Sequence, residues 1–136
     1  MPGLILKLGP GERFVANGVV IENGDRRARL NILTPESKVL RLRDAIHPEE
    51  VNTPVRRVCY IAQLVLAGEA DPDEAKPQIS FGIGQLMSVF DKGEGRVVLE
   101  RARAALDEDR FYPLLRTLRA LLPYEQELMD AAEASA

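Results

Sequence analysis

The sequence has few of the residues that enzymes use for nucleophilic catalysis and metal binding. It holds one histidine, His47, and one cysteine, Cys59, and their positions suggest no Ser-His or Cys-His pair. A metal would have to be bound by carboxylates alone, and the adjacent acids Asp71, Asp73 and Glu74 match the first turn of a helix better than a metal site. Glycine pairs occur without the lysine and the serine or threonine of a phosphate-binding loop. We therefore expect a protein that is not an enzyme and has no cofactor.

Long apolar runs and disulfide-forming cysteines are also missing. No run approaches the roughly 20 apolar residues of a membrane-spanning helix, and the N-terminus lacks a basic stretch followed by an apolar one. Cys59 cannot form an internal disulfide, and its apolar surroundings indicate a small buried side chain. The 136 residues are 46% hydrophobic and 29% charged, as in ordinary globular proteins. These features predict a cytoplasmic protein that does not bind a membrane.

Charge is divided unevenly along the chain. The net charge is −3, yet residues 1–46 hold 8 Lys and Arg against 5 Asp and Glu, while residues 47–136 hold 10 against 16. The first part is therefore cationic, with a net charge of +3, and the remainder has a net charge of −6. A polyanion would be attracted to the first part and repelled by the second. Considered by charge alone, arginines on strands are more often only solvated surface.

Short strands are predicted before residue 47. Strands are expected at 4–8, 14–15, 19–22, 28–32 and 40–42, and in the last two of these segments every second residue is apolar. Asn17-Gly18 is the strongest hairpin signal, because both central residues of a type I′ turn need positive φ, and Asn23-Gly24 repeats it. The Thr-Pro-Glu-Ser sequence at 34–37 predicts a tight loop joining two strands. In these two strands the arginines alternate with the apolar residues, so Arg29, Arg41 and Arg43 are expected on the face that points away from the core.

After Ile46 the apolar period changes from two to about 3.6, which predicts helices. Thr53-Pro54 has the pattern of an N-cap followed by proline at the first helical position, and Gly68 ends that helix. Pro77 is expected to interrupt the helix signal at Asp71, leaving residues 67–78 as a flexible loop. Further helices are predicted from Pro77, over 96–108, over 111–122 and after Pro123.

The predicted fold class is α+β. A small antiparallel β-rich module at residues 1–46 is expected to be followed by a helical part of four or five helices at 47–136, which packs on the module. Short strands leave open edges and bury little apolar area, so the sequence also predicts a homodimer or a higher homo-oligomer built through the sheet.

Several stretches of the sequence resemble two known families. IENGDRRARLNILT, NTPVRRVCY and FYPLLRTLRALLPYE resemble the FlbT family of flagellin post-transcriptional regulators, over nearly the whole chain. The LIL sequence at 4–6, ARLNILTP at 28–35 and RDAI at 43–46 resemble the CsrA family of small β-rich dimers that bind mRNA leaders, over about the first third. The FlbT resemblance implies a repressor or regulator that binds the 5′ untranslated region of flagellin mRNA and controls its translation or decay during flagellum assembly.

The CsrA resemblance implies where RNA would bind. In that family the first and last strands pair between subunits, and the arginine that ends the last strand contacts single-stranded RNA. Arg43 matches that arginine, and residues 4–6 match the first strand. Together with the cations expected on the same surface, the predicted RNA-binding residues are Leu4, Ile5, Leu6, Lys7, Arg26, Arg27, Arg29, Arg41 and Arg43.

A second hypothesis places the working surface in the helical half. An acidic helical array with leucine-rich stripes can hold an amphipathic helix of a protein partner. The FlbT resemblance implies flagellin or the small flagellar partner FlaF as that protein. Leu114, Leu118 and Leu121 would make the contact, although such a stripe more often only covers the sheet. RNA binding through phosphates must weaken steeply with salt, whereas apolar docking should not.

Overall fold

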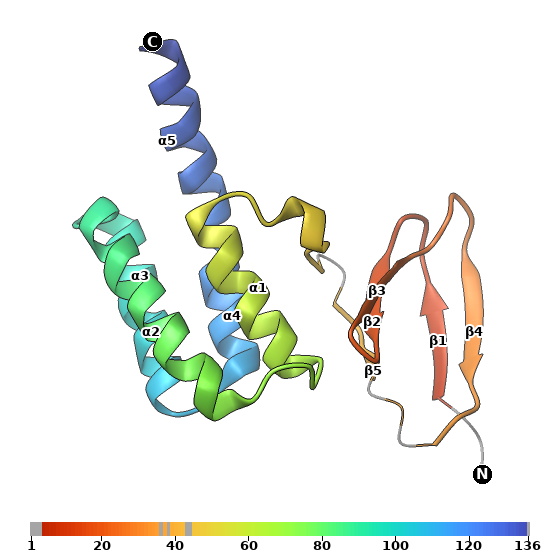
Figure 1. Ribbon diagram of the computed structural model, residues 1–136. Coiled ribbons are helices and arrows are strands. Elements are labelled where there is room, and N and C mark those ends of the chain that lie inside the picture. The colour runs from red at the N-terminus through yellow and green to blue at the C-terminus, as the bar shows by residue number, and fades with distance from the viewer. Residues whose placement is uncertain (1–3, 36, 38, 43–44, 136) are drawn as a thin grey trace.

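The computed structural model describes residues 4–35, 37, 39–42 and 45–135. Over these residues, five short strands are followed by a short 3-10 helix and five α-helices. They are β1 (Leu4–Leu8), β2 (Arg13–Ala16), β3 (Val19–Glu22), β4 (Ala28–Ile32), β5 (Val39–Leu40), η1 (Pro48–Glu50), α1 (Pro54–Leu66), α2 (Pro72–Val89), α3 (Gly93–Asp107), α4 (Phe111–Arg119) and α5 (Leu122–Ala134). The strands lie on one side of the molecule and the helices on the other (Figure 1). The predicted α+β class is confirmed.

The strands form two small antiparallel sheets. β1 pairs with β4 from Leu4 opposite Ile32 to Leu8 opposite Ala28, and β2 lies between β3 and β5. The turn from β2 to β3 is formed by Asn17 and Gly18, whose φ angles are 49° and 83°. Positive φ at both residues is what the predicted type I′ hairpin requires, so this prediction is confirmed.

Two other expected hairpins do not form among the described residues. The strands on either side of Asn23-Gly24, and those on either side of residues 34–37, belong to different sheets, so these two predictions were wrong. β4 pairs instead with β1, because β1 offers five residues in register whereas β5 has two. Local turn signals predicted where the chain bends but not which strand becomes the partner.

The start of α1 follows the sequence, whereas α3 begins earlier than predicted, at Gly93, and the predicted helix over 111–122 is divided between α4 and α5. The Oγ1 of Thr53 accepts a hydrogen bond from the backbone N–H of Arg56 at 3.2 Å, which confirms the predicted N-cap. The expected interruption at Pro77 was wrong, because α2 continues through it and shortens the predicted loop to residues 67–71. A proline here removes one hydrogen bond of the helix, while Ala75 and Ile79 on either side of it are buried and hold the helix against its neighbours.

One apolar core joins the helices to part of the β module. Leu114, Leu118 and Leu121 are fully buried in it, and α4 packs on α1 and α3, so the leucine stripe belongs to the helical core. From the β module, Val15 and Leu42 reach the same core. A smaller second core of Leu6, Leu8 and Phe14 lies between the two sheets. The ribbon of β1 and β4 is therefore fixed by this small core and lies farthest from the helices (Figure 1).

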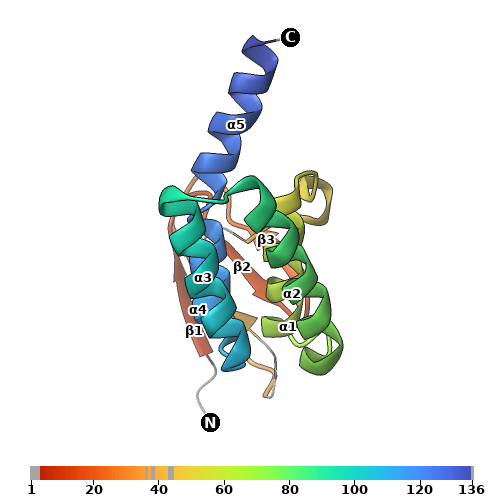
Figure 2. The same cartoon turned by 90° about the vertical axis from the view of Figure 1, so that its left-hand side faces the viewer.

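α5 projects beyond the other helices, with the C-terminus at its tip (Figures 1 and 2). It is anchored by Glu125, which is 9% exposed and whose carboxylate accepts the backbone N–H of Val55 at 3.0 Å. Val55 is in the first turn of α1, where N–H groups lack partners within the helix and negative charge is favoured. The first turn of α5 is thus tied to the start of α1.

Candidate nucleic-acid interface

Cationic side chains gather on one face of the β1–β4 ribbon. Lys7 stands opposite Arg29 in the antiparallel ladder, and Ile5 stands opposite Asn31. Alternate side chains of a strand share a face, so these four residues point to the same side. Arg27, two residues before Arg29, continues the row beyond the strand end. We name this surface, formed by these five exposed residues, the basic strand face.

The basic strand face has an electrostatic reason to bind an anion. Two like charges directly opposite each other on an antiparallel pair repel, at a Cβ separation of about 5 Å. Neither Lys7 nor Arg29 takes part in any of the ion pairs found within the described part of the chain. A phosphate between the two side chains would replace this repulsion by attraction.

Arg26 and Arg27 extend from a turn whose backbone is fixed. The side-chain Nδ2 of Asn23 donates to the carbonyl oxygens of Gly9 and Arg26, both at 2.8 Å. Both arginine side chains are exposed next to this fixed backbone. In the sequence Asn23 is only a hairpin signal, and its positioning role could not be predicted because the contact with Gly9 spans 14 residues of chain.

Asn31 is a further site residue that was not predicted from the sequence. It is exposed beside Ile5 on the basic strand face, and its amide offers both a donor and an acceptor to a base edge. The only signal in the sequence was its spacing of two from Arg29.

The three predicted apolar residues of β1 lie in different environments. Leu4 and Ile5 are 50% and 45% exposed and can contact a ligand. Leu6 is 4% exposed and packs with Leu8 and Phe14, so its side chain belongs to the core and only its backbone is near the surface.

Arg41 bridges the two sheets. Its guanidinium donates to the carboxylate of Glu12 at 2.9 Å and to the carbonyl oxygen of Lys7 at 2.5 Å. Arg41 therefore holds the end of β5 against β1, and its side chain does not share the row of Lys7 and Arg29. Arg43, the residue matched to the RNA-contacting arginine of the CsrA family, lies outside the described residues.

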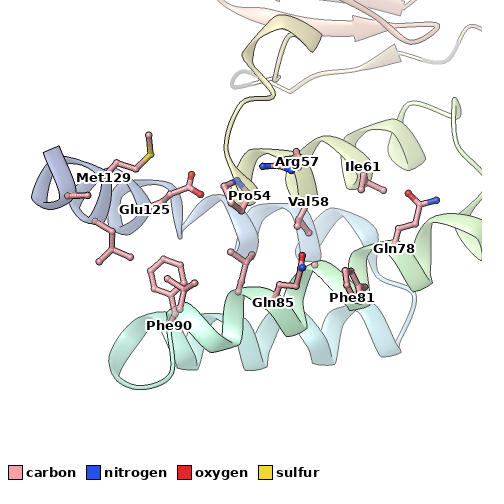
Figure 3. Close-up of a pocket in the computed structure, with 15 residues that line it drawn as sticks. Pro54, Arg57, Val58, Ile61, Gln78, Phe81, Gln85, Phe90, Glu125 and Met129 are labelled. Atoms are coloured by element: carbon pink, nitrogen blue, oxygen red, sulfur yellow. The ribbon is translucent and has the colours of Figure 1, made fainter. Parts of the chain in front are cut away.

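A second candidate surface is an apolar groove of about 680 Å³ between α1, α2 and α5. Figure 3 shows Val58 and Ile61 of α1 facing Phe81 and Gln85 of α2, with α5 at one end. Its most exposed apolar residues are Phe81 (69%), Val89 (60%) and Leu128 (47%). This groove is separate from the leucine stripe of α4, which is buried.

His47 and Cys59 have structural surroundings. His47 is the N-cap of η1, and its Nδ1 accepts the N–H of Glu49 at 3.1 Å. Burial of Cys59, and then the charge of Glu125, raise the pKa of the thiol to about 12, so it stays protonated and unreactive at neutral pH. Among the described residues, no three histidines, cysteines or acids come together in a way that could hold a metal ion.

Comparison with known proteins identifies the family. The model of the family described as "Flagellar protein FlbT" matches residues 4–129. The chain belongs to the FlbT family. It is 32% identical over 127 residues to the "Flagellum biosynthesis repressor protein FlbT" of Caulobacter vibrioides (strain ATCC 19089 / CIP 103742 / CB 15), covering 91% of this chain and 87% of the relative. It is also 29% identical over 126 residues to the "Probable flagellum biosynthesis repressor protein FlbT" of Chelativorans sp. (strain BNC1), covering 93% and 86%.

The FlbT match spans both the strands and the helices, so the β module and the helical part occur together in this family. No solved structure matches the chain significantly. Across the described residues, none of the helices has the length and apolar character needed to span a membrane.

Proposed function

We propose that this FlbT-family chain is an RNA-binding regulator of flagellin synthesis. It binds the 5′ untranslated region of flagellin mRNA in the cytoplasm and controls translation or decay of the message, without catalysis and without a cofactor. The names of its relatives place those proteins in the repression of flagellum biosynthesis. The observation that carries the RNA-binding proposal is the opposed pair of Lys7 and Arg29 at the centre of the basic strand face.

The residues of this face suit single-stranded RNA. The guanidinium of Arg29 can hold a phosphate with two parallel hydrogen bonds, whereas the ammonium of Lys7 acts as a point charge. Asn31 can pair with the edge of an unstacked base, and the exposed side chain of Ile5 gives that base an apolar contact. Phosphate contacts would supply affinity, and Asn31 would supply part of the discrimination between sequences.

We propose a homodimer or higher homo-oligomer formed through the β1–β4 ribbon. Among the described residues each of these strands pairs with one other strand, so the ribbon has two open edges. A two-stranded ribbon is marginally stable alone, and Leu4 (50%) and Leu33 (77%) leave apolar surface exposed beside it. A second copy that pairs along one edge would bury this surface and double the cationic face.

The function predicts specific, salt-sensitive binding of leader RNA. Purified protein should bind a flagellin leader RNA more tightly than a scrambled RNA of the same length and composition, in a fluorescence anisotropy titration. Affinity for both RNAs should fall as salt rises, with a slope of log K against log salt of about −0.7 per phosphate contact. Equal affinity for the two RNAs, or affinity that does not change with salt, would contradict the proposal.

The groove between α1, α2 and α5 favours a second candidate function, that of an adaptor for flagellin or FlaF. An amphipathic helix of such a partner could lay its apolar face on Phe81, Val89 and Leu128, which are exposed along one continuous groove. Lysine or arginine residues beside that apolar face would meet the acids of α5, a helix that has no basic residue.

The adaptor function predicts that Leu128→Ser lowers affinity for purified flagellin or FlaF by about 5-fold or more, since an apolar side chain of the groove is replaced by a polar one. Val97→Ser is the matched control, because Val97 is 46% exposed on α3 and does not line the groove, whereas Leu128 is 47% exposed within it. Isothermal titration calorimetry measures both variants. If neither protein binds, or if the two substitutions have the same effect, the adaptor function is wrong.

A further inference from the structure

A second cationic surface lies where the end of β5 approaches α4. A hollow of about 930 Å³ is lined there by Arg41, Arg116 and Arg119, together with Tyr112. No aspartate or glutamate lines it within the described part of the chain. The sequence of α4, FYPLLRTLR, contains no acid. Because Arg41 is paired with Glu12, the positive charge of the hollow comes from Arg116 and Arg119, in an otherwise acidic helical half.

The two arginines of α4 are placed to receive an anion. They stand in the last helical turn, where positive charge complements the helix dipole, so the helix accommodates both charges without a ligand. Arg119 is half-buried, and burial lowers the pKa of its guanidinium because the charged form loses hydration.

Tyr112 adds a surface for a base. Its side chain is 44% exposed at the wall of the hollow, on the first turn of α4. Exposed aromatic rings beside cations are a common arrangement in single-stranded nucleic-acid sites, where the cations follow the phosphates and the ring stacks on a base of any sequence.

Arg41 connects the hollow to β1. Its guanidinium lines the hollow and also donates to the carbonyl oxygen of Lys7 at 2.5 Å. The side chain of Lys7 belongs to the basic strand face, so the two cationic surfaces adjoin the same residue of β1. One RNA strand that lies on the basic strand face could therefore continue into the hollow.

We propose that this hollow is a second RNA contact, in which Arg116 and Arg119 hold backbone phosphate and Tyr112 stacks on one base. The inference rests on the proposed RNA-binding function and extends it by giving the helical half a share in affinity. Phosphate contacts and base stacking do not recognise the edge of a base. The hollow therefore raises affinity for RNA without discriminating between RNA sequences.

The test compares variants of the full chain in anisotropy titrations with leader RNA and scrambled RNA. The double variant Arg116→Ala and Arg119→Ala should have lower affinity for both RNAs, by the same factor. The slope of log K against log salt should become shallower by about 0.7 for each phosphate that the protein no longer neutralises. Tyr112→Leu should lower affinity for both RNAs by about 5-fold or more. Tyr112→Phe should retain wild-type affinity because the aromatic ring remains. Lys92→Ala combined with Arg101→Ala is the charge-matched control, since both residues are exposed in the helical half and neither lines the hollow.

The outcomes separate this inference from the proposed function. If wild-type protein prefers the leader RNA and the Arg116/Arg119 variant binds as tightly as the Lys92/Arg101 control variant, the inference is overturned and the proposed function stands. If wild-type protein does not discriminate between the RNAs but the double variant loses affinity and salt slope, the proposed sequence-specific function fails and the hollow is retained as a phosphate site. If a free mononucleotide displaces the RNA as readily as unlabelled RNA does, the hollow serves a small ligand and the inference is overturned. Circular dichroism of the double variant checks that it is folded, and Arg119→Lys, which preserves the charge, should keep wild-type affinity.

Discussion

Replacing Gln63 by leucine is expected to destabilise the protein by about 2–6 kcal/mol. Gln63 is 3% exposed, its Oε1 accepts the backbone N–H of Ile46 at 2.7 Å, and its Nε2 donates to the carbonyl of the same residue at 2.9 Å. Ile46 is the point where the β module passes into the helical part, and it is 7% exposed. Leucine would leave two buried backbone groups without partners, at about 1–3 kcal/mol each.

Urea unfolding followed by circular dichroism measures this loss. Gln126→Leu is the matched control, because Gln126 is exposed on α5 and its hydrogen bond to Asp130 is accessible to water. The control should stay within about 0.5 kcal/mol of the wild-type free energy of unfolding. If Gln63→Leu unfolds at the same urea concentration as the control, the two hydrogen bonds do not fix the passage between the two halves of the chain.

Changing both Lys7 and Arg29 to alanine is expected to lower affinity for leader RNA by about 3–6 kcal/mol, which is roughly 100-fold or more, because hydrogen bonds to charged groups contribute about 1.5–3 kcal/mol each. Both side chains would contact RNA at the centre of the basic strand face, so their removal eliminates two contacts at once. The free energy of unfolding should not fall, because the two exposed cations repel each other across the ladder.

The control for this prediction removes the same charge elsewhere. Lys92→Ala combined with Arg101→Ala takes away one lysine and one arginine, both exposed in the helical half. Anisotropy titrations should show nearly wild-type affinity for the control. Equal losses in the two double variants would mean that binding responds to total charge, and the basic strand face would lose its special role.

The sequence predicted the helical half well because its signals are local. The change of apolar period at Ile46, and the N-cap at Thr53, depend on residues within one or two turns. The prediction of a helix break at Pro77 was wrong, because packing of the residues around Pro77 stabilises α2 by more than the lost hydrogen bond costs. That packing involves helices distant in sequence.

The β module was predicted less completely. Alternation placed Arg29 on the outer face, but the partner strand was wrong, because pairing of β4 with β1 joins segments about 24 residues apart that no turn signal connects. Arg41 and Glu12, which form an ion pair, are 29 residues apart in the sequence. Arg116 and Arg119, which line the same hollow as Arg41, are still farther from it in the sequence. Such contacts depend on tertiary structure and cannot be predicted from local sequence patterns.

The most direct test of the central claim, that leader RNA binds the basic strand face, is a titration of ¹⁵N-labelled protein with leader RNA followed by NMR. The account predicts the largest shifts of backbone amide signals at Lys7, Arg27, Arg29 and Asn31, and small shifts along α2 and α5. Shifts confined to the groove between α1, α2 and α5, or no shifts at RNA concentrations that saturate anisotropy binding of the wild type, would contradict it.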